Sequence, residues 1–303
     1  MANSLEKDIF RTLAYFSYFT YPLTSFEIWK WQLDPEMPRS YEEITNALEN
    51  STWLANFLAY KDGFWGVYWK TVPIEEQIAE RHRRNINAFA KHRKLKRVLK
   101  YLSRIPWVKG IAICNTLAWH HTEPRSDIDL FLIVDDRRVW STRLFAVAPL
   151  ALLSQRPGET IEDPIDISFF VTEASMNLEH LKITNDDPYL AVWTRSLLPV
   201  YGKDLLWDMW RAENRWSEKT VPAAAWRRGS LRLTNKKKSK WRIPISEAFA
   251  RQLQLKRLPE ELRDLANKDS RVVVADHILK FHKNDRRQEI QNALIEAMKL
   301  CEI

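Results

Sequence analysis

Apolar residues in the first seventy positions follow a helical period three times and then change to a strand pattern. The stripe of the first helix consists of Leu5, Ile9, Leu13 and Phe16. Thr24 can cap a second helix that ends near Trp31, and Ser40 with Glu43 three residues later forms a capping box for a third. Aromatic and branched residues flank an Asp-Gly turn within 53–69, which predicts a β-hairpin after the three helices.

One long helix is predicted to start after Pro73 and to continue to about Arg104, where an Ile-Pro pair ends it. Its second half, 81–104, contains ten basic residues and no acidic one. Apolar residues recur within it at helical spacing: Ile86, Phe89, Leu95, Val98 and Leu102. We therefore expect one face of this helix to pack on the protein and the opposite face to be cationic.

The middle of the chain alternates between strand and helix patterns. Buried strands are predicted at 108–114, 127–134 and 165–171, with a helix at 138–153 before the third of them. This alternation is typical of an α/β fold. After Asp187 the pattern is helical and rich in tryptophan, and the polybasic segment 235–242 is predicted to be an exposed loop.

Composition excludes several classes of protein. Apolar residues make up 45% and charged residues 28% of the 303 positions, as in soluble globular chains. The six glycines are too scattered for a Walker A loop or a dinucleotide-binding fingerprint, and two cysteines cannot build a disulfide framework or a zinc cluster. The longest apolar run, 144–153, is about half the ~20 residues that a membrane span needs. We expect a cytoplasmic protein without a membrane segment.

The net charge of +8 is unevenly distributed along the chain. Residues 81–104 carry +10 and residues 201–303 carry +9, whereas the other two regions are acidic. Two cationic blocks suit a long polyanion, so we expect nucleic acid to bind through both. The contacts expected in the first block are Arg93, Lys94 and Arg97. The alternative is that these charges form solvated helix faces without a partner.

Three aspartates stand where two predicted strands could place them together. Asp127 and Asp129 are two residues apart, so in a strand their carboxylates share one face, roughly 6.6 Å apart. Asp166 lies between two isoleucines of another strand and could be aimed at the same point. Adjacent anions repel, and hard oxygen ligands favour Mg²⁺. The alternative is that the aspartates cap turns at strand ends.

The stretch 114–134, together with Ile-Asp-Ile at 165–167, resembles the nucleotidyltransferase superfamily that includes DNA polymerase beta and the minimal nucleotidyltransferases. That family is marked by Gly-Ser at a helix start, an Asp-x-Asp strand about a dozen residues later, and a third acidic residue in a later strand. Thr116 occupies the serine position, eleven residues before Asp127. Asn115 replaces the glycine, and Trp-His replaces the usual Arg-Gly that follows.

The resemblance implies roles for particular residues. Mg²⁺ or Mn²⁺ would be held by Asp127, Asp129 and Asp166. The phosphates of a nucleoside triphosphate would be held by Asn115 and Thr116, with Arg125 as a further contact. Asparagine tolerates the left-handed backbone conformation better than other non-glycine residues, and threonine keeps the hydroxyl, so the phosphate-binding turn is expected to persist.

The order of the regions also resembles a bacterial group of proteins with an N-terminal winged helix and no assigned substrate. We therefore expect an α/β fold with a nucleotidyltransferase-type mixed sheet. Its regions would be a winged-helix-like domain, a basic connecting helix, a catalytic domain and a helical, tryptophan-rich, basic C-terminal domain: 1–72, 73–106, 107–185 and 186–303. The third helix of the first domain, 40–50, has three glutamates and no basic residue, so it is not expected to read DNA.

The function expected from these residues is transfer of NMP from an NTP to an acceptor hydroxyl, with nucleic acid, RNA in particular, as the acceptor. The alternative is a non-catalytic nucleic-acid-binding or regulatory protein built on a degenerate nucleotidyltransferase domain. Arg286 and Arg287 in the segment 281–287 either contact phosphates or pair with acidic residues of a neighbouring helix, and the sequence does not distinguish these.

Overall fold

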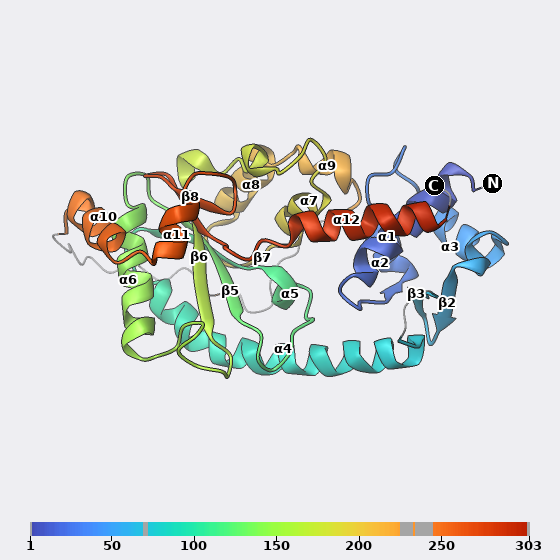
Figure 1. Cartoon of the computed structure of the whole chain (residues 1–303), viewed down its shortest axis with the longest axis horizontal. Helices are drawn as coiled ribbons and strands as arrows, with labels where there is room; N and C mark the ends of the chain where they lie inside the picture. Colours follow the sequence, from blue (N-terminus) through green and yellow to red (C-terminus); the bar gives the residue numbers. More distant parts are fainter. Residues whose placement is uncertain (1, 69–71, 225–232, 234–244, 302–303) are drawn as a thin grey trace.

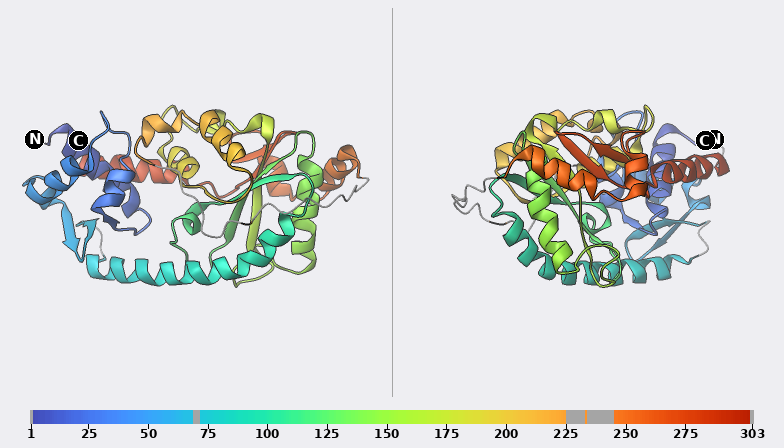
Figure 2. Two further views of the ribbon diagram at one scale, coloured as in Figure 1. Left: turned by 180° about the vertical axis from the view of Figure 1, so that it is seen from behind. Right: turned by 60° about the vertical axis from the view of Figure 1, so that its left-hand side comes forward.

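A computed structural model describes residues 2–68, 72–224, 233 and 245–301. The protein is mixed α/β, with a small helical region at one end and a larger region built on a six-stranded sheet at the other (Figure 1). Helix α4 (Ile74–Leu102) runs along one side of the molecule and helix α12 (Arg287–Leu300) along the opposite side (Figures 1 and 2). Within the described ranges no helix is long and apolar enough to span a membrane.

The N-terminal region contains three helices and a three-stranded antiparallel sheet. The helices are α1 (Ser4–Ser17), α2 (Ser25–Lys30) and α3 (Tyr41–Asn50), and the strands are β1 (Leu23–Thr24), β2 (Leu58–Lys61) and β3 (Phe64–Val67), in the order β1-β3-β2. The capping roles predicted for Thr24 and for Ser40 with Glu43 are confirmed. The hairpin is confirmed too, although its first strand is shorter than expected because Leu54–Asn56 forms a 3-10 helix, η1.

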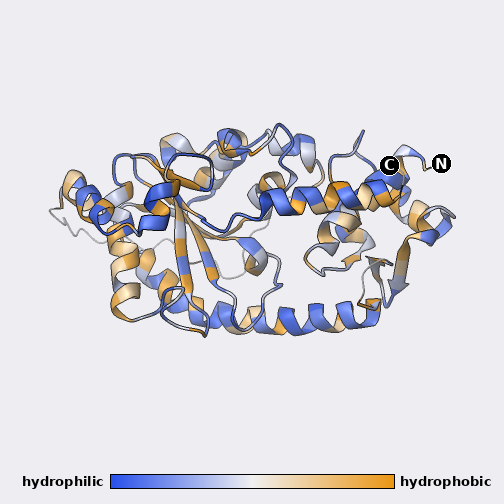
Figure 3. Cartoon of the chain, viewed as in Figure 1, coloured by the Kyte–Doolittle hydropathy of each residue, from blue (hydrophilic) through white to orange (hydrophobic). Residues whose placement is uncertain are grey.

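Helix α4 has the predicted length, and Leu95, Val98 and Leu102 of its predicted apolar stripe pack on the core, but the first part of the stripe does not. Ile86 and Phe89 are 71% and 57% exposed, whereas Lys91 is completely buried. The face that meets the protein carries polar side chains at helical spacing: Arg84, Asn87 and Lys91 contact the segment 121–126. Tertiary hydrogen bonds, rather than the apolar stripe, therefore decide how this part of the helix is oriented. Figure 3 shows that α4 is hydrophilic along most of its length.

The main sheet has the strand order β7-β4-β5-β6-β9-β8. Its strands are β4 (Val108–Ile113), β5 (Ile128–Val134), β6 (Ile165–Thr172), β7 (Leu198–Tyr201), β8 (Val272–Val274) and β9 (Ile278–Phe281). Only β5 and β6 pair in parallel. Both faces are covered: Leu130 and Leu132 join a core that includes residues of α6 (Val139–Leu152), and Phe131 and Ile133 join a core that includes residues of α8 (Asp204–Glu213). Burial on both faces explains the continuous apolar runs of these strands.

The expectation of a purely helical C-terminal region is wrong. The range 186–303 supplies β7, β8 and β9, which extend the sheet at both edges. These strands are three or four residues long, too short for a periodic pattern. Long-range pairing with β4 and β6 stabilises β7 and β9, and β8 pairs with β9. The helices of this range are α7 (Pro188–Ser196), α8, α9 (Ser217–Thr220), α10 (Glu247–Lys256), α11 (Glu260–Leu265) and α12.

A buried ion-pair network anchors the start of α12. The guanidinium of Arg287 lies 2.9 Å from a carboxylate oxygen of Asp187 and 2.8 Å from one of Asp285, and all three side chains are buried. Burial alone would raise the pKa of Asp285, but hydrogen bonds from Arg287 and its charge lower that pKa to about 2. The network therefore contributes stability above the ordinary aspartate pKa of about 4 and loses it as the pH falls toward 2.

Replacing Arg287 with leucine is expected to lower the free energy of unfolding by about 3–5 kcal/mol at neutral pH, because the buried carboxylate of Asp187 loses its cation and that of Asp285 keeps only Lys280. Urea denaturation measures the change. Arg286→Leu is the matched control: this neighbouring side chain is 64% exposed, so its loss should cost less than about 1 kcal/mol. Equal costs for the two variants would contradict the anchoring role.

Candidate active site

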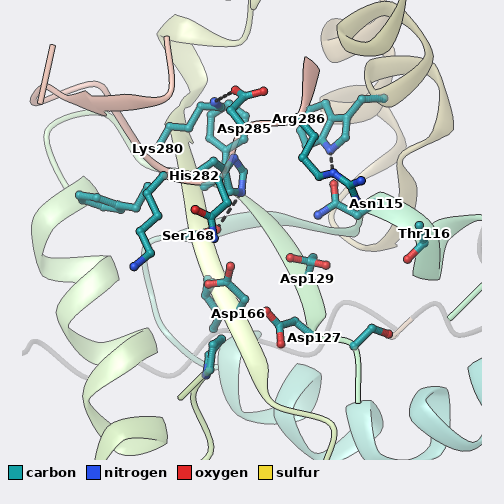
Figure 4. Close-up of a pocket in the computed structure, with 18 of the residues that line it drawn as sticks. Asn115, Thr116, Asp127, Asp129, Asp166, Ser168, Lys280, His282, Asp285 and Arg286 are labelled. Atoms are coloured by element: carbon teal, nitrogen blue, oxygen red, sulfur yellow. Dashed lines mark hydrogen bonds and ion pairs between the residues drawn. The ribbon is translucent and has the colours of Figure 1, made fainter. Parts of the chain in front are cut away.

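The structure brings the three predicted aspartates to one cavity of about 870 Å³ (Figure 4). Asp127 immediately precedes β5, Asp129 is its second residue, and Asp166 is the second residue of β6. The parallel register of these strands sets Asp129 directly beside Asp166. One extra residue in β6 between Asp166 and Phe169, opposite Asp129 and Phe131, interrupts that register just beyond the acids.

The electrostatics of the site are those of anions without enough counter-charge. Burial raises the pKa of Asp129, and repulsion by Asp166 raises it further. Burial also raises the pKa of Asp166 and of Asp127, although Lys91 opposes the shift at Asp127. Carboxylate oxygens that repel one another in a buried site suit a hard divalent cation. Among the described residues, however, no three His, Cys, Asp or Glu side chains already form a metal-binding group.

Asn115 and Thr116 are the first two residues of the short helix α5 (Asn115–Ala118), which follows β4, and both line the cavity. Asn115 has a φ of 56°, the left-handed conformation that its residue type was expected to tolerate. The indole N–H of Trp193 donates to Asn115 Oδ1 at 2.8 Å, and the Asn115 side chain also hydrogen-bonds to Asp129. The side chain of Asn115 therefore orients a carboxylate, and it is Thr116 that presents a hydroxyl to the cavity.

Arg125, predicted as a phosphate contact, is exposed and is not among the residues that line the cavity. Six other lysine and arginine side chains line it, and they come from two parts of the chain far apart in the sequence: Arg143, Arg156, Lys280, Lys283, Arg286 and Arg287. In the segment 281–287 both arginines pair with acids: Arg287 with Asp187 and Asp285, and Arg286 with Glu289 of α12 at 3.0 Å. Both also line the cavity.

Lys91 is a site-supporting residue that sequence reasoning assigned to the cationic face of the long helix. Its ammonium group pairs with Asp163 at 3.0 Å and donates to the backbone carbonyls of Pro124 and Ser126. These contacts hold the segment that leads into Asp127. The position of Lys91 on the same helical face as Ala88 and Leu95 is the signal that could have shown it to be buried.

A hydrogen-bond chain from the C-terminal segment supports Asp166. The Nε2 atom of His282 lies 3.0 Å from the hydroxyl oxygen of Ser168, and that hydroxyl hydrogen-bonds to Asp166. Burial lowers the pKa of His282 to about 3, so the imidazole is neutral at physiological pH. Ser168 and His282 thus fix the orientation of the third carboxylate without adding charge.

The N-terminal region closes one side of the cavity with Tyr18 and Phe19. His121 is buried: its Nε2 atom lies 2.9 Å from the carbonyl oxygen of Phe19 and 2.8 Å from the guanidinium of Arg84. The imidazole therefore joins the N-terminal region, α4 and the segment before Asp127.

Comparison of the chain with models of protein families, with curated proteins and with solved structures finds no match. The chemistry of the site is therefore the basis on which its function has to be argued.

Asp129→Asn is expected to stabilise the protein in the absence of metal. Because the pKa of Asp129 is raised in the folded state, the wild-type protein loses stability as the pH rises above about 4, where the unfolded carboxyl ionises freely. The variant removes that loss, so its advantage in urea denaturation should grow between pH 4 and pH 8. Asp208→Asn, on an exposed part of α8, is the control and should show no such trend. A variant less stable than wild type at pH 8 would refute the repulsion.

Proposed function

We propose that this protein is a metal-dependent nucleotidyltransferase that transfers NMP from an NTP to an acceptor hydroxyl on RNA. The observation that carries the proposal is the register of β5 and β6, which sets Asp129 beside Asp166 in a cavity that Asp127 also lines. Basic side chains, among them Lys283 and Arg286, line the same cavity, as a triphosphate requires. Phosphoryl transfer needs carboxylates that bind a divalent cation and basic side chains that bind phosphates, and this cavity contains both.

The donor chemistry of the aspartates fits Mg²⁺ or Mn²⁺, which Asp127, Asp129 and Asp166 would hold. When bound, such an ion offsets the charge of the acids and of the reacting phosphate. Thr116 is placed to bind phosphate oxygens through its hydroxyl, while Asn115 keeps Asp129 oriented.

Asp166 is suited to act as the base. In the reaction, the acceptor oxygen forms a bond to the α-phosphorus, the bond to the bridging oxygen breaks, and pyrophosphate leaves with the electron pair. The proton of the acceptor hydroxyl passes to Asp166, whose pKa is raised by burial toward the range that general bases need. Ser168 and His282 hold the carboxylate in place during that transfer.

The exposed face of α4 supports a nucleic acid as the acceptor. Arg93, Lys96, Arg97 and Lys100 are exposed on it. Lys94, expected to join them, instead donates to the carbonyls of Glu162 and Asp163 at 3.0 Å. The polybasic segment 235–242 lies outside the described residues. The acidic surface of α3, with Glu42, Glu43 and Glu49, argues against a DNA-reading role for the N-terminal region.

The second candidate is a non-catalytic nucleic-acid-binding or regulatory protein on the same fold. What favours it is that the acids of the described chain are not preassembled as a metal-binding group. What opposes it is the electrostatic cost of keeping repelling carboxylates together, which only a ligand or a proton relieves. Metal-dependent NTP binding distinguishes the two candidates.

Incubation of the protein with each labelled NTP, Mg²⁺ or Mn²⁺, and total cellular RNA is expected to label the RNA. The double variant Asp127→Asn/Asp129→Asn should abolish labelling and metal-dependent NTP binding, because the cation loses two ligands. Calorimetry measures NTP affinity directly, with Asp208→Asn as the control. An unchanged Mg²⁺-ATP affinity in the double variant would refute the active-site assignment.

RNA affinity is expected to fall by roughly two orders of magnitude between 50 and 200 mM salt, as about four to six phosphate contacts would produce. Arg93→Glu/Arg97→Glu should flatten the slope of log affinity against log salt by about 1.4 or more, since two contacts are lost. Lys61→Glu/Arg137→Glu, exposed residues outside both cationic blocks, matches the change in net charge and should leave the slope nearly unchanged. If both pairs shift the slope equally, α4 is not the RNA-binding face.

A further inference from the structure

The cavity has a wall beyond Asp166 that the roles assigned so far leave unused. Helix α6 and the segment after it line this wall with Arg143 and Arg156, and β9 contributes Phe281. Aliphatic side chains lie around them: Val147, Leu150, Pro157 and Leu262. Thr116 follows β4 directly, and in the strand order β5 lies between β4 and β6. Asp129 on β5 and Asp166 on β6 therefore separate Thr116 from the wall that carries Arg143 and Arg156.

Arg143 is a half-buried cation without a carboxylate partner. Its Nη1 donates to Gln254 Oε1 at 2.7 Å, its guanidinium lies 4.5 Å from the centre of the Phe281 ring, and its Nε is buried with no hydrogen-bond partner. Across the described chain, no carboxylate reaches it at ion-pair distance. Burial and the nearby charge of Arg156 lower its pKa to about 10.

The partner chosen for Arg143 holds the guanidinium without neutralising it. The amide nitrogen of Gln254 donates to the carbonyl oxygens of Trp140 at 2.8 Å and of Ala250 at 2.9 Å, which leaves its Oε1 directed at Arg143. A glutamate in the same position would form an ion pair. The side chain is thus positioned and its charge kept available, as an anion-binding site requires.

Other arginines of this chain that are shielded from solvent have carboxylate partners. Arg287 pairs with two aspartates, Arg81 pairs with Glu27 at 2.6 Å, and Arg195 pairs with Glu218 at 3.3 Å. A buried guanidinium that lacks a carboxylate is costly unless a ligand supplies the negative charge. The planar donors of arginine match the oxygens of a phosphate group.

The segment after α6 also connects this wall to the cationic face of α4. Arg156 enters the cavity from the start of the loop 156–163, and Lys91 and Lys94 bind the end of the same loop at Asp163. Basic side chains therefore stand at both ends of this loop, where Arg156 lies 3.7 Å from Glu159 and Lys91 pairs with Asp163. A chain of phosphates fits this arrangement better than a small molecule with one phosphate does.

We infer that Arg143, assisted by Arg156, binds the 3′-terminal phosphodiester of an RNA acceptor and so places its terminal hydroxyl beside Asp166. This inference rests on the proposed function and identifies its acceptor site. The triphosphate belongs to the opposite wall, next to Thr116. Binding of acceptor and of NTP then depend on different side chains, which makes the two separable by experiment.

The experiment measures binding of two fluorescent RNA pentamers to the full-length protein by anisotropy. One has five ordinary nucleotides, and in the other the last linkage is a neutral methylphosphonate. Wild type is expected to bind the first at least about tenfold more tightly, as loss of a charge-assisted hydrogen bond in a shielded site predicts. Arg143→Gln should remove this preference. Arg251→Gln, an exposed arginine on α10 that pairs with Asp276, is the matched control and should keep it.

Gln254→Glu is the second variant, since it keeps the guanidinium and supplies a carboxylate for it. The preference for the charged linkage should again disappear, while Mg²⁺-NTP affinity stays unchanged in both variants. Circular dichroism verifies that each variant folds. No preference in wild type, or a preference retained in a folded Gln254→Glu, overturns the inference.

Two further outcomes separate this inference from the proposed function. If Arg143→Gln weakens Mg²⁺-NTP binding and leaves the RNA preference intact, Arg143 serves the triphosphate, and the acceptor site is overturned while nucleotidyl transfer stands. If wild type binds RNA with the expected preference but neither binds NTP nor labels RNA, the phosphate site at Arg143 is supported and the transferase proposal fails.

Discussion

The parallel pairing of β5 with β6 is the constraint on which the site depends. It sets Asp129 beside Asp166 at the N-terminal ends of two central strands, where repulsion between the carboxylates raises the pKa of Asp129. Nothing in the packing of the strands requires acids there. Three neighbouring side chains reduce the electrostatic cost of this repulsion: Asn115 and Ser168 donate hydrogen bonds to the carboxylates, and Lys91 supplies a nearby positive charge. A divalent cation would offset the repulsion that these side chains leave.

The two long helices, α4 and α12, connect the site to the N-terminal region. Helix α4 lies against the segment before Asp127 through Lys91, and helix α12 starts at the Arg287 network and packs on α1 (Figure 1). Tyr18 and Phe19 therefore reach the cavity although the N-terminal region has its own small sheet. The Tyr18 hydroxyl donates to Glu289 of α12 at 2.6 Å, which joins the two regions at the rim.

Local rules predicted those parts of the fold whose signals are complete within a few residues. The caps of α2 and α3, the length of α4 and the central strands β4, β5 and β6 all follow from capping residues and apolar runs. The left-handed turn at Asn115 follows from the residue type. Strands β7, β8 and β9 were missed because three or four residues hold no periodic signal, and β7 and β9 pair with strands far away along the chain.

The sequence by itself determined the acids, since the strand period places Asp127 and Asp129 on one side and a second strand supplies Asp166. Only the tertiary structure decided which basic side chains lie near these aspartates. Arg125, near in sequence, is exposed outside the cavity, whereas Arg143, Arg286 and Lys91 reach the site from three different helices or their ends. The physical reason is that a carboxylate's place in a strand is a local property. A long basic side chain takes its role from whichever element packs beside it.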